Sequence, residues 1–77
     1  MARVITEGII FVIEENGIKE EWMIVPQGES DPSRNRISIQ SPFAQALLGQ
    51  KKGARVMIKA PGGEYEVVIL EIDENGG

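Results

Sequence analysis

The sequence contains neither cysteine nor histidine. Without cysteine the chain can form no disulfide and can offer no thiolate to zinc. Without histidine it lacks the commonest metal ligand and the usual general base near neutral pH. Ser-His-Asp and Cys-His catalytic arrangements are thereby excluded, although carboxylates and lysines could still act. We therefore expect a protein that is not an enzyme and that carries no metal or other cofactor.

Long apolar runs are also missing. No stretch approaches the roughly 20 apolar residues that span a bilayer, and the N-terminus lacks the apolar segment of a secretory signal. A chain of 77 residues is short enough to be one domain, and it must be held together by an apolar core. We expect a cytoplasmic protein that makes no membrane contact.

Acidic residues are absent from the middle of the chain. All twelve acids lie outside residues 34–59, whereas this segment carries six of the eight basic residues, namely Arg34, Arg36, Lys51, Lys52, Arg55 and Lys59. One interpretation is solvated charge that folding mixes with acids from elsewhere. The other is a polarised surface that meets an acidic partner, for which Lys51 and Lys52 are candidate contacts. Direct nucleic-acid binding is not expected, because the protein is acidic overall and has only four aromatic residues.

A β-hairpin is the clearest local prediction. Residues 8–14 contain the apolar run IIFVI, and residues 19–25 return as a second strand. Asn16-Gly17 between them is the strongest short hairpin signal, because both residues tolerate positive φ. A two-residue turn there predicts the opposed pairs Phe11 with Trp22, Ile9 with Ile24, and Glu14 with Lys19.

A polar loop over residues 26–35 follows, longer than a simple connection requires. Glu29 and Asp31 in this loop could together bind a cation, but Asp31-Pro32 is more simply a turn initiator. Residues 36–40 then alternate as a short strand.

Ser41-Pro42 predicts a helix start, with a hydroxyl N-cap followed by proline at the first helical position. Gly49 is placed to end this helix in a left-handed conformation. The residues between them that form one apolar stripe are Phe43, Ala44, Leu47 and Leu48.

Two further strands are predicted at residues 55–60 and 64–72, joined by a Pro-Gly-Gly turn. The second is apolar on both faces, which is typical of a central strand. We expect residues 1–7 to be a lead-in, residues 73–77 to be a disordered tail, and at least two of the four aromatic side chains to lie in the core. The predicted fold class is α+β, a small antiparallel sheet on one short helix.

Residues 37–49 read ISIQSPFAQALLG, and Gly53 and a PGG turn at 61–63 follow. Upstream, IV stands at residues 24–25 and GESDP at 28–32. In this order and spacing, from about residue 8 to residue 72, the sequence resembles the C-terminal domain of the bacterial Gre transcript-cleavage factors, GreA and GreB. The resemblance implies an FKBP-like fold, in which a curved antiparallel sheet cradles one short helix.

The resemblance further implies docking on bacterial RNA polymerase, at the rim-helix coiled coil of its secondary channel. In the family this contact lies around the loop that leads into the helix, which corresponds here to Gln40, Ser41 and Pro42, with Phe43 adjacent. Three of these residues also have purely structural explanations, as cap, first helical residue and core. Ala54 replaces an aspartate that is common in the family, which we interpret as a minor change in a turn.

Gre factors place a coiled-coil hairpin before this domain, and acids at its tip hold the metal that drives transcript hydrolysis. Only seven residues precede Gly8 here, so we expect a polymerase-binding module that does not cleave RNA. Two alternatives stay open. One is regulation of another protein, such as nucleoside diphosphate kinase, as in short-armed relatives of the family. The other is prolyl isomerase activity, which the fold suggests and which needs an aromatic-lined apolar pocket.

Overall fold

The first two strands form the hairpin that Asn16 and Gly17 predict. The computed structural model describes residues 3–73, and in it β1 (Ile10–Glu15) pairs antiparallel with β2 (Ile18–Val25). The φ angles of Asn16 and Gly17 are 51° and 79°. These are the left-handed values that a tight two-residue hairpin turn requires.

The register of this hairpin agrees with the sequence. The confirmed opposed pairs are Phe11 with Trp22 and Glu14 with Lys19. Ile9 precedes β1 and forms no ladder pair with Ile24; instead, the Gly8 N–H donates to the Ile24 carbonyl at 2.8 Å.

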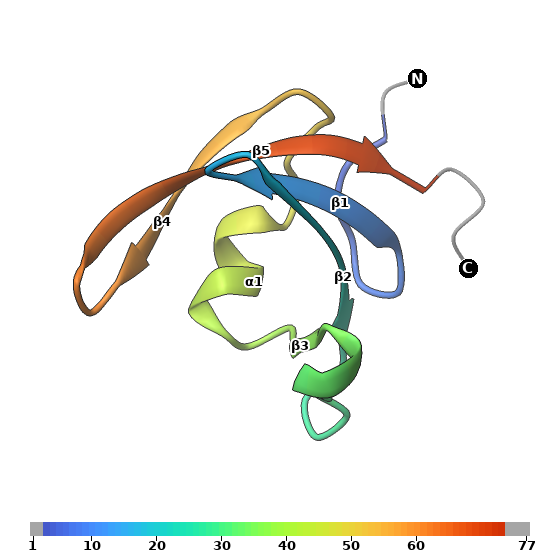
Figure 1. The fold of residues 1–77 in the computed structure, drawn as a ribbon. Helices are drawn as coiled ribbons and strands as arrows, with labels where there is room; N and C mark the ends of the chain where they lie inside the picture. Colours follow the sequence, from blue (N-terminus) through green and yellow to red (C-terminus); the bar gives the residue numbers. More distant parts are fainter. Residues whose placement is uncertain (1–2, 74–77) are drawn as a thin grey trace.

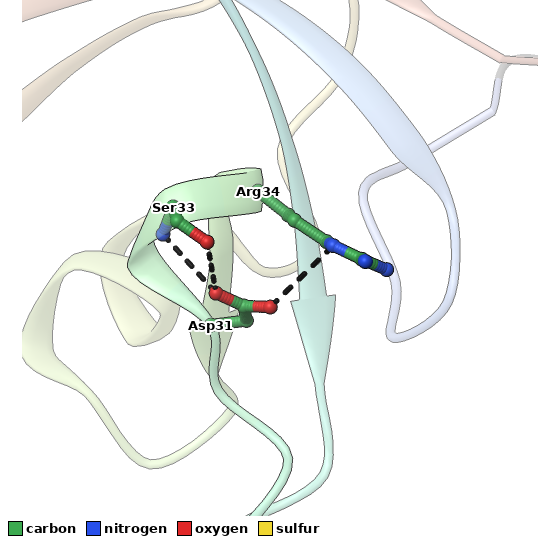
Figure 2. Close-up of polar contacts among 3 residues, drawn as sticks. All are labelled: Asp31, Ser33 and Arg34. Atoms are coloured by element: carbon green, nitrogen blue, oxygen red, sulfur yellow. Dashed lines mark hydrogen bonds and ion pairs between the residues drawn. The ribbon is translucent and has the colours of Figure 1, made fainter.

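The polar loop after β2 contains a short 3-10 helix, η1 (Pro32–Arg34), which Asp31 caps. One carboxylate oxygen of Asp31 accepts hydrogen bonds from the backbone N–H and the hydroxyl of Ser33, at 3.2 and 2.6 Å. The other oxygen lies 3.7 Å from Nε of Arg34 (Figure 2). Because both oxygens already serve local turn structure, the turn-initiator interpretation of Asp31 is favoured over cation binding with Glu29.

β3 (Arg36–Ser38) pairs with β2 in the parallel direction, with Ile37 opposite Ile24. The sheet is therefore mixed rather than purely antiparallel, and this strand is shorter than the predicted residues 36–40. Parallel neighbours cannot be joined by a tight turn, because the chain must first return to the end at which the earlier strand began. The long loop over residues 26–35 makes that return.

The last two strands, β4 (Arg55–Ala60) and β5 (Gly63–Ile72), form a second hairpin. β5 also pairs antiparallel with β1, which gives the sheet the strand order β3-β2-β1-β5-β4. β5 thus has a neighbour on each side, as its two apolar faces predict.

A β-bulge interrupts the pairing of β1 with β5. Val12 faces Glu71, and the next residue, Ile13, faces Ile69. Leu70 is consequently left without a residue opposite it. A bulge of this kind bends a strand and increases its twist, and the sheet curves over the helix (Figure 1).

α1 (Pro42–Leu47) lies on the concave side of the sheet (Figure 1). The Ser41 hydroxyl accepts a hydrogen bond from the Ala44 N–H at 3.1 Å, and Gly49 has a φ of 82°, so both predicted helix ends are confirmed. A helix of six residues is not stable alone. It depends on packing, and Ala44 and Leu47 are fully buried against the sheet.

The apolar core lies between α1 and the concave face of the sheet. It is built from Ile5, Phe11, Ile13, Ile24, Ala44, Leu47, Val56, Ile58, Val67, Ile69 and Ile72. Ile5 belongs to this core although it lies in the predicted lead-in. Its N–H donates to the Gln50 carbonyl and its carbonyl accepts from the Gly49 N–H, both at 2.9 Å. The packed structure therefore includes residues before Gly8.

The four aromatic side chains do not all enter this core. Phe11 is fully buried, whereas Trp22, Phe43 and Tyr65 are half-buried and pack at the edge of the core. The sequence predicts at least two aromatic residues in the core; Phe11 lies in it, and the other three pack against it while partly exposed. Three of the four are therefore available to line a surface feature.

Residues 74–77 of the predicted tail lie outside the described residues. The Asp73 N–H still donates to the Ile10 carbonyl, at 2.9 Å. Within residues 3–73, no helix is long and apolar enough to cross a membrane.

Candidate functional site

The segment that leads into α1 is fixed by a set of short hydrogen bonds. The Ser41 N–H donates to the Ser38 carbonyl at 2.9 Å, and the Gln40 N–H donates to the Ser38 hydroxyl at 3.1 Å. From α1, the Gln45 side-chain amide reaches back to the Ile39 carbonyl at 2.6 Å. The backbone of this segment is thus held in one conformation.

Four of the six predicted contact residues, residues 40–43, are contiguous in this segment. Gln40 and Pro42 are exposed, whereas Ser41 and Phe43 are half-buried. The hydroxyl of Ser41 is occupied as the helix cap. Gln40 and Pro42 are accordingly the side chains most open to a partner.

Phe43 is held by an aromatic contact with Trp22 on β2. The ring centroids are 5.4 Å apart and the ring planes are inclined by 63°, an edge-to-face arrangement that the ring quadrupoles favour. The contact ties the start of α1 to the first hairpin.

A pocket of about 430 Å³ opens beside this segment. α1 has six residues and is roughly 9 Å long. β2 and β5 have 8 and 10 residues and extend over roughly 26 to 33 Å. The helix therefore covers only part of the concave face, and the pocket occupies uncovered surface between the start of α1 and the two hairpins.

The wall of this pocket is mainly apolar. The three half-buried aromatic residues, Trp22, Phe43 and Tyr65, all contribute to it, and its charged residues are Glu15, Glu20 and Lys59. The pKa of Tyr65 is raised above its ordinary value, first by burial and then by the negative charges of Glu15 and Glu20. Both carboxylates therefore act electrostatically on the tyrosine hydroxyl.

Trp22 carries a buried polar atom without a partner. Its indole Nε1–H is enclosed and meets no acceptor among the described residues. An unmade hydrogen bond of this kind costs about 1–3 kcal/mol in folding free energy. The ring nevertheless stays at this position, where it contacts Phe43 and forms part of the pocket wall.

The other two predicted contact residues, Lys51 and Lys52, lie beyond the opposite end of α1. Lys51 forms an isolated bridge with Val4, and Lys52 Nζ lies 3.4 Å from a carboxylate oxygen of Glu71. Tyr65 in the pocket wall and Glu71 are six residues apart on β5, which corresponds to roughly 20 Å along the strand. The structure thus separates the two lysines from residues 40–43.

The described ion pairs join the basic middle segment to acids from outside it. Arg34 pairs with Asp31 and Lys52 with Glu71, and both pairs are exposed to solvent. These pairs favour the interpretation in which folding brings the basic segment together with acids from elsewhere in the chain. Surface pairs of this kind contribute only about 0–1 kcal/mol to the stability of the fold.

Comparison with known proteins identifies the family. The family model described as "Transcription elongation factor, GreA/GreB, C-term" matches residues 3–74. The chain belongs to the GreA/GreB C-terminal domain family. Among curated relatives, the transcription elongation factor GreA of Shouchella clausii is 53% identical over 57 residues, which cover 74% of this chain and 36% of that protein. GreA of Bacillus anthracis is 42% identical over 71 residues, 90% of this chain and 45% of that protein.

Solved structures of Gre-type proteins share this fold. The transcription factor Gfh1 matches with a TM-score of 0.84 at 26% identity, over 94% of this chain and 49% of that one. A GreA/GreB factor from Nitrosomonas europaea matches with a TM-score of 0.77 at 27% identity, over 94% of this chain and 62% of that one. The α+β, FKBP-like fold class is thereby confirmed. The chain is a Gre-type transcription elongation factor module and spans less than half the length of the curated relatives that it matches.

The acids of residues 3–73 are spread over the surface of the hairpins and loops. Within residues 3–73, no group of three or more acidic side chains is placed to hold a metal ion. On the hairpin, Glu14 and Glu21 alternate with Glu15 and Glu20 along their strands and so project from the opposite face.

The pocket residues Glu15, Glu20, Trp22 and Tyr65 were not predicted as site residues from the sequence. Part of the signal was present, because the predicted hairpin register already places Glu20 opposite Ile13. That register shows the apolar face giving way to an acid near the turn. The pocket itself also depends on how far α1 extends over the sheet, which the local sequence pattern does not show.

Proposed function

We propose that this Gre-type domain docks on bacterial RNA polymerase through residues 40–43, at the rim helices of the secondary channel, and cleaves no RNA itself. One observation carries the proposal: an ordered, partly exposed turn stands beside an apolar pocket in a domain of the GreA/GreB family. Pre-ordered segments bind with little entropic cost. Gln40 and Pro42 supply exposed contact surface, and Ser41 and Phe43 hold the turn in position.

Lys51 and Lys52 are proposed as a second contact, separate from the first and electrostatic. Both side chains are exposed, and long-range charge acts mainly on the rate of association. Their contribution should therefore weaken as the salt concentration rises.

The test measures binding of the domain to a polymerase fragment that carries the rim helices. Pro42→Ala is the main variant, because alanine is a good helix former and adds no charge to the pocket that Pro42 lines. We expect at least a tenfold loss of affinity with an unchanged melting temperature. If Pro42→Ala binds as tightly as the parent domain, residues 40–43 do not form the contact.

The double variant Lys51→Glu/Lys52→Glu tests the second contact. We expect unchanged folding, slower association at low salt and little difference at high salt. Unchanged affinity at low salt would mean that Lys51 and Lys52 are solvated surface residues. The proposed contact through residues 40–43 would not be affected by that result. Absence of parent-domain binding at high micromolar concentration would contradict the whole proposal.

A second candidate function, prolyl isomerisation, gains support from the three aromatic side chains in the pocket wall. Fold alone does not carry this activity. A proline-peptide isomerisation assay with and without the domain tests it, with Tyr65→Ala as the pocket variant. A rate equal to that of the uncatalysed peptide would exclude it.

A further inference from the structure

The face of the first hairpin that lines the pocket changes from apolar to acidic toward the turn. Side chains two apart on a strand share a face, so Ile13 and Glu15 lie together on β1, as Trp22 and Glu20 do on β2. Ile13 is directly opposite Glu20. All four side chains line the pocket. The apolar wall therefore ends in two carboxylates that come from neighbouring strands.

Aromatic rings and negative charge thus occur together in this pocket. Three aromatic residues line it, and its two carboxylates outnumber the single ammonium group, that of Lys59. Lys59 lies opposite Glu64 in the β4–β5 ladder, and its side chain is exposed to solvent. The electrostatic balance of the pocket is negative.

We propose that the pocket receives one arginine side chain of the protein partner. This inference rests on the proposed docking of the adjacent residues 40–43. The aliphatic stem of arginine suits the apolar wall. The planar guanidinium stacks on aromatic rings and donates two parallel hydrogen bonds to a carboxylate.

The carboxylates of Glu15 and Glu20 favour an arginine side chain in the pocket over an apolar or an acidic one. An apolar side chain would desolvate Glu15 and Glu20 and offer them no donor in return, which is unfavourable. An acidic side chain would be repelled by them. A cation on an apolar stem satisfies the wall and also neutralises the rim, and arginine does so with more donors than lysine.

The first experiment uses two small probes of matched shape, n-butylguanidinium and the neutral n-butylurea. Trp22 is the only tryptophan of the chain and lies in the pocket wall, so its fluorescence reports occupancy directly. At equal ionic strength we expect roughly tenfold tighter binding of n-butylguanidinium. Equal affinity for the two probes would mean an apolar occupant and would overturn the proposal.

The second experiment removes the charges without changing shape. Glu15→Gln/Glu20→Gln should abolish the preference for the cationic probe and leave n-butylurea binding unchanged. The matched control is Glu21→Gln/Glu66→Gln, which removes the same charge from the opposite face of the sheet, where both side chains are exposed. This control should keep the preference. If both double variants lose the preference for n-butylguanidinium equally, the preference comes from the net charge of the domain. That result would refute the proposal that the pocket binds an arginine side chain.

The polymerase fragment separates this inference from the docking proposal. If the parent domain binds the fragment, Glu15→Gln/Glu20→Gln should weaken that binding roughly tenfold at an unchanged melting temperature. If the fragment binds but the double variant binds equally well, the arginine assignment fails and docking through residues 40–43 stands. If the fragment does not bind while the probe preference is present, the docking proposal fails, and with it the assignment of the arginine to that partner.

Discussion

Replacing Ser41 with alanine tests how far the start of α1 depends on one hydroxyl. Ser41 Oγ accepts a hydrogen bond from the Ala44 N–H at 3.1 Å, and alanine offers no acceptor. Loss of an N-cap costs about 0.5–2 kcal/mol. Ala44 is fully buried, so water replaces the missing acceptor poorly and the cost should lie in the upper half of that range. We expect about 1.5 kcal/mol.

This loss is large enough to measure by thermal or urea unfolding. For a domain of this size, 1 kcal/mol corresponds to roughly 4–8 °C in melting temperature, so Ser41→Ala should lower it by about 6–12 °C. Ser41→Asp retains an acceptor and adds favourable charge at the helix N-terminus, and it should stay within about 0.5 kcal/mol of the parent. A loss below about 0.3 kcal/mol in Ser41→Ala would refute the capping argument.

Three further expectations concern the core, the hairpin turn and the pocket. Ile69→Ala removes a fully buried side chain from the central strand and should cost about 2–5 kcal/mol in urea unfolding. Gly17→Ala places a Cβ at a φ of 79° and should destabilise the domain by about 1 kcal/mol, read from the same transitions. The pKa of Tyr65 is raised by burial and by Glu15 and Glu20, so its contribution to stability is complete below its ordinary pKa and is lost as the pH rises through the folded-state value. Ultraviolet titration of this single tyrosine should show a higher pKa in the folded domain than in urea, and a smaller rise in Glu15→Gln/Glu20→Gln; identical values in the folded and unfolded states would contradict the cause.

The parts of the fold that the sequence predicts are those fixed by local chemistry. Asn16-Gly17 determines the type of turn, and the type of turn determines the register of the hairpin. Ser41 and Gly49 mark the helix ends because a cap acceptor and a left-handed residue act within a few positions of themselves. Each of these signals needs no information from distant parts of the chain.

The parts that the sequence does not predict depend on distant contacts. β3 could pair with β2 in either direction, and the path of residues 26–35 decides which. The bulge that leaves Leu70 unpaired depends on how β1 and β5 meet, and alternation along β5 alone does not locate it. The separation of Lys51 from residues 40–43 follows from the course of the chain past α1.

The pocket lies beside the N-terminal end of a short helix. α1 begins only at Pro42 and has six residues, so the pocket beside its start stays uncovered. A helix that began before Pro42 would bury more apolar surface and would add stability, but it would cover the pocket. The buried indole N–H without an acceptor is a second cost at the same place. Sites at which a fold gives up stability are where binding is most often found, and both costs here lie beside the segment that we propose contacts the partner.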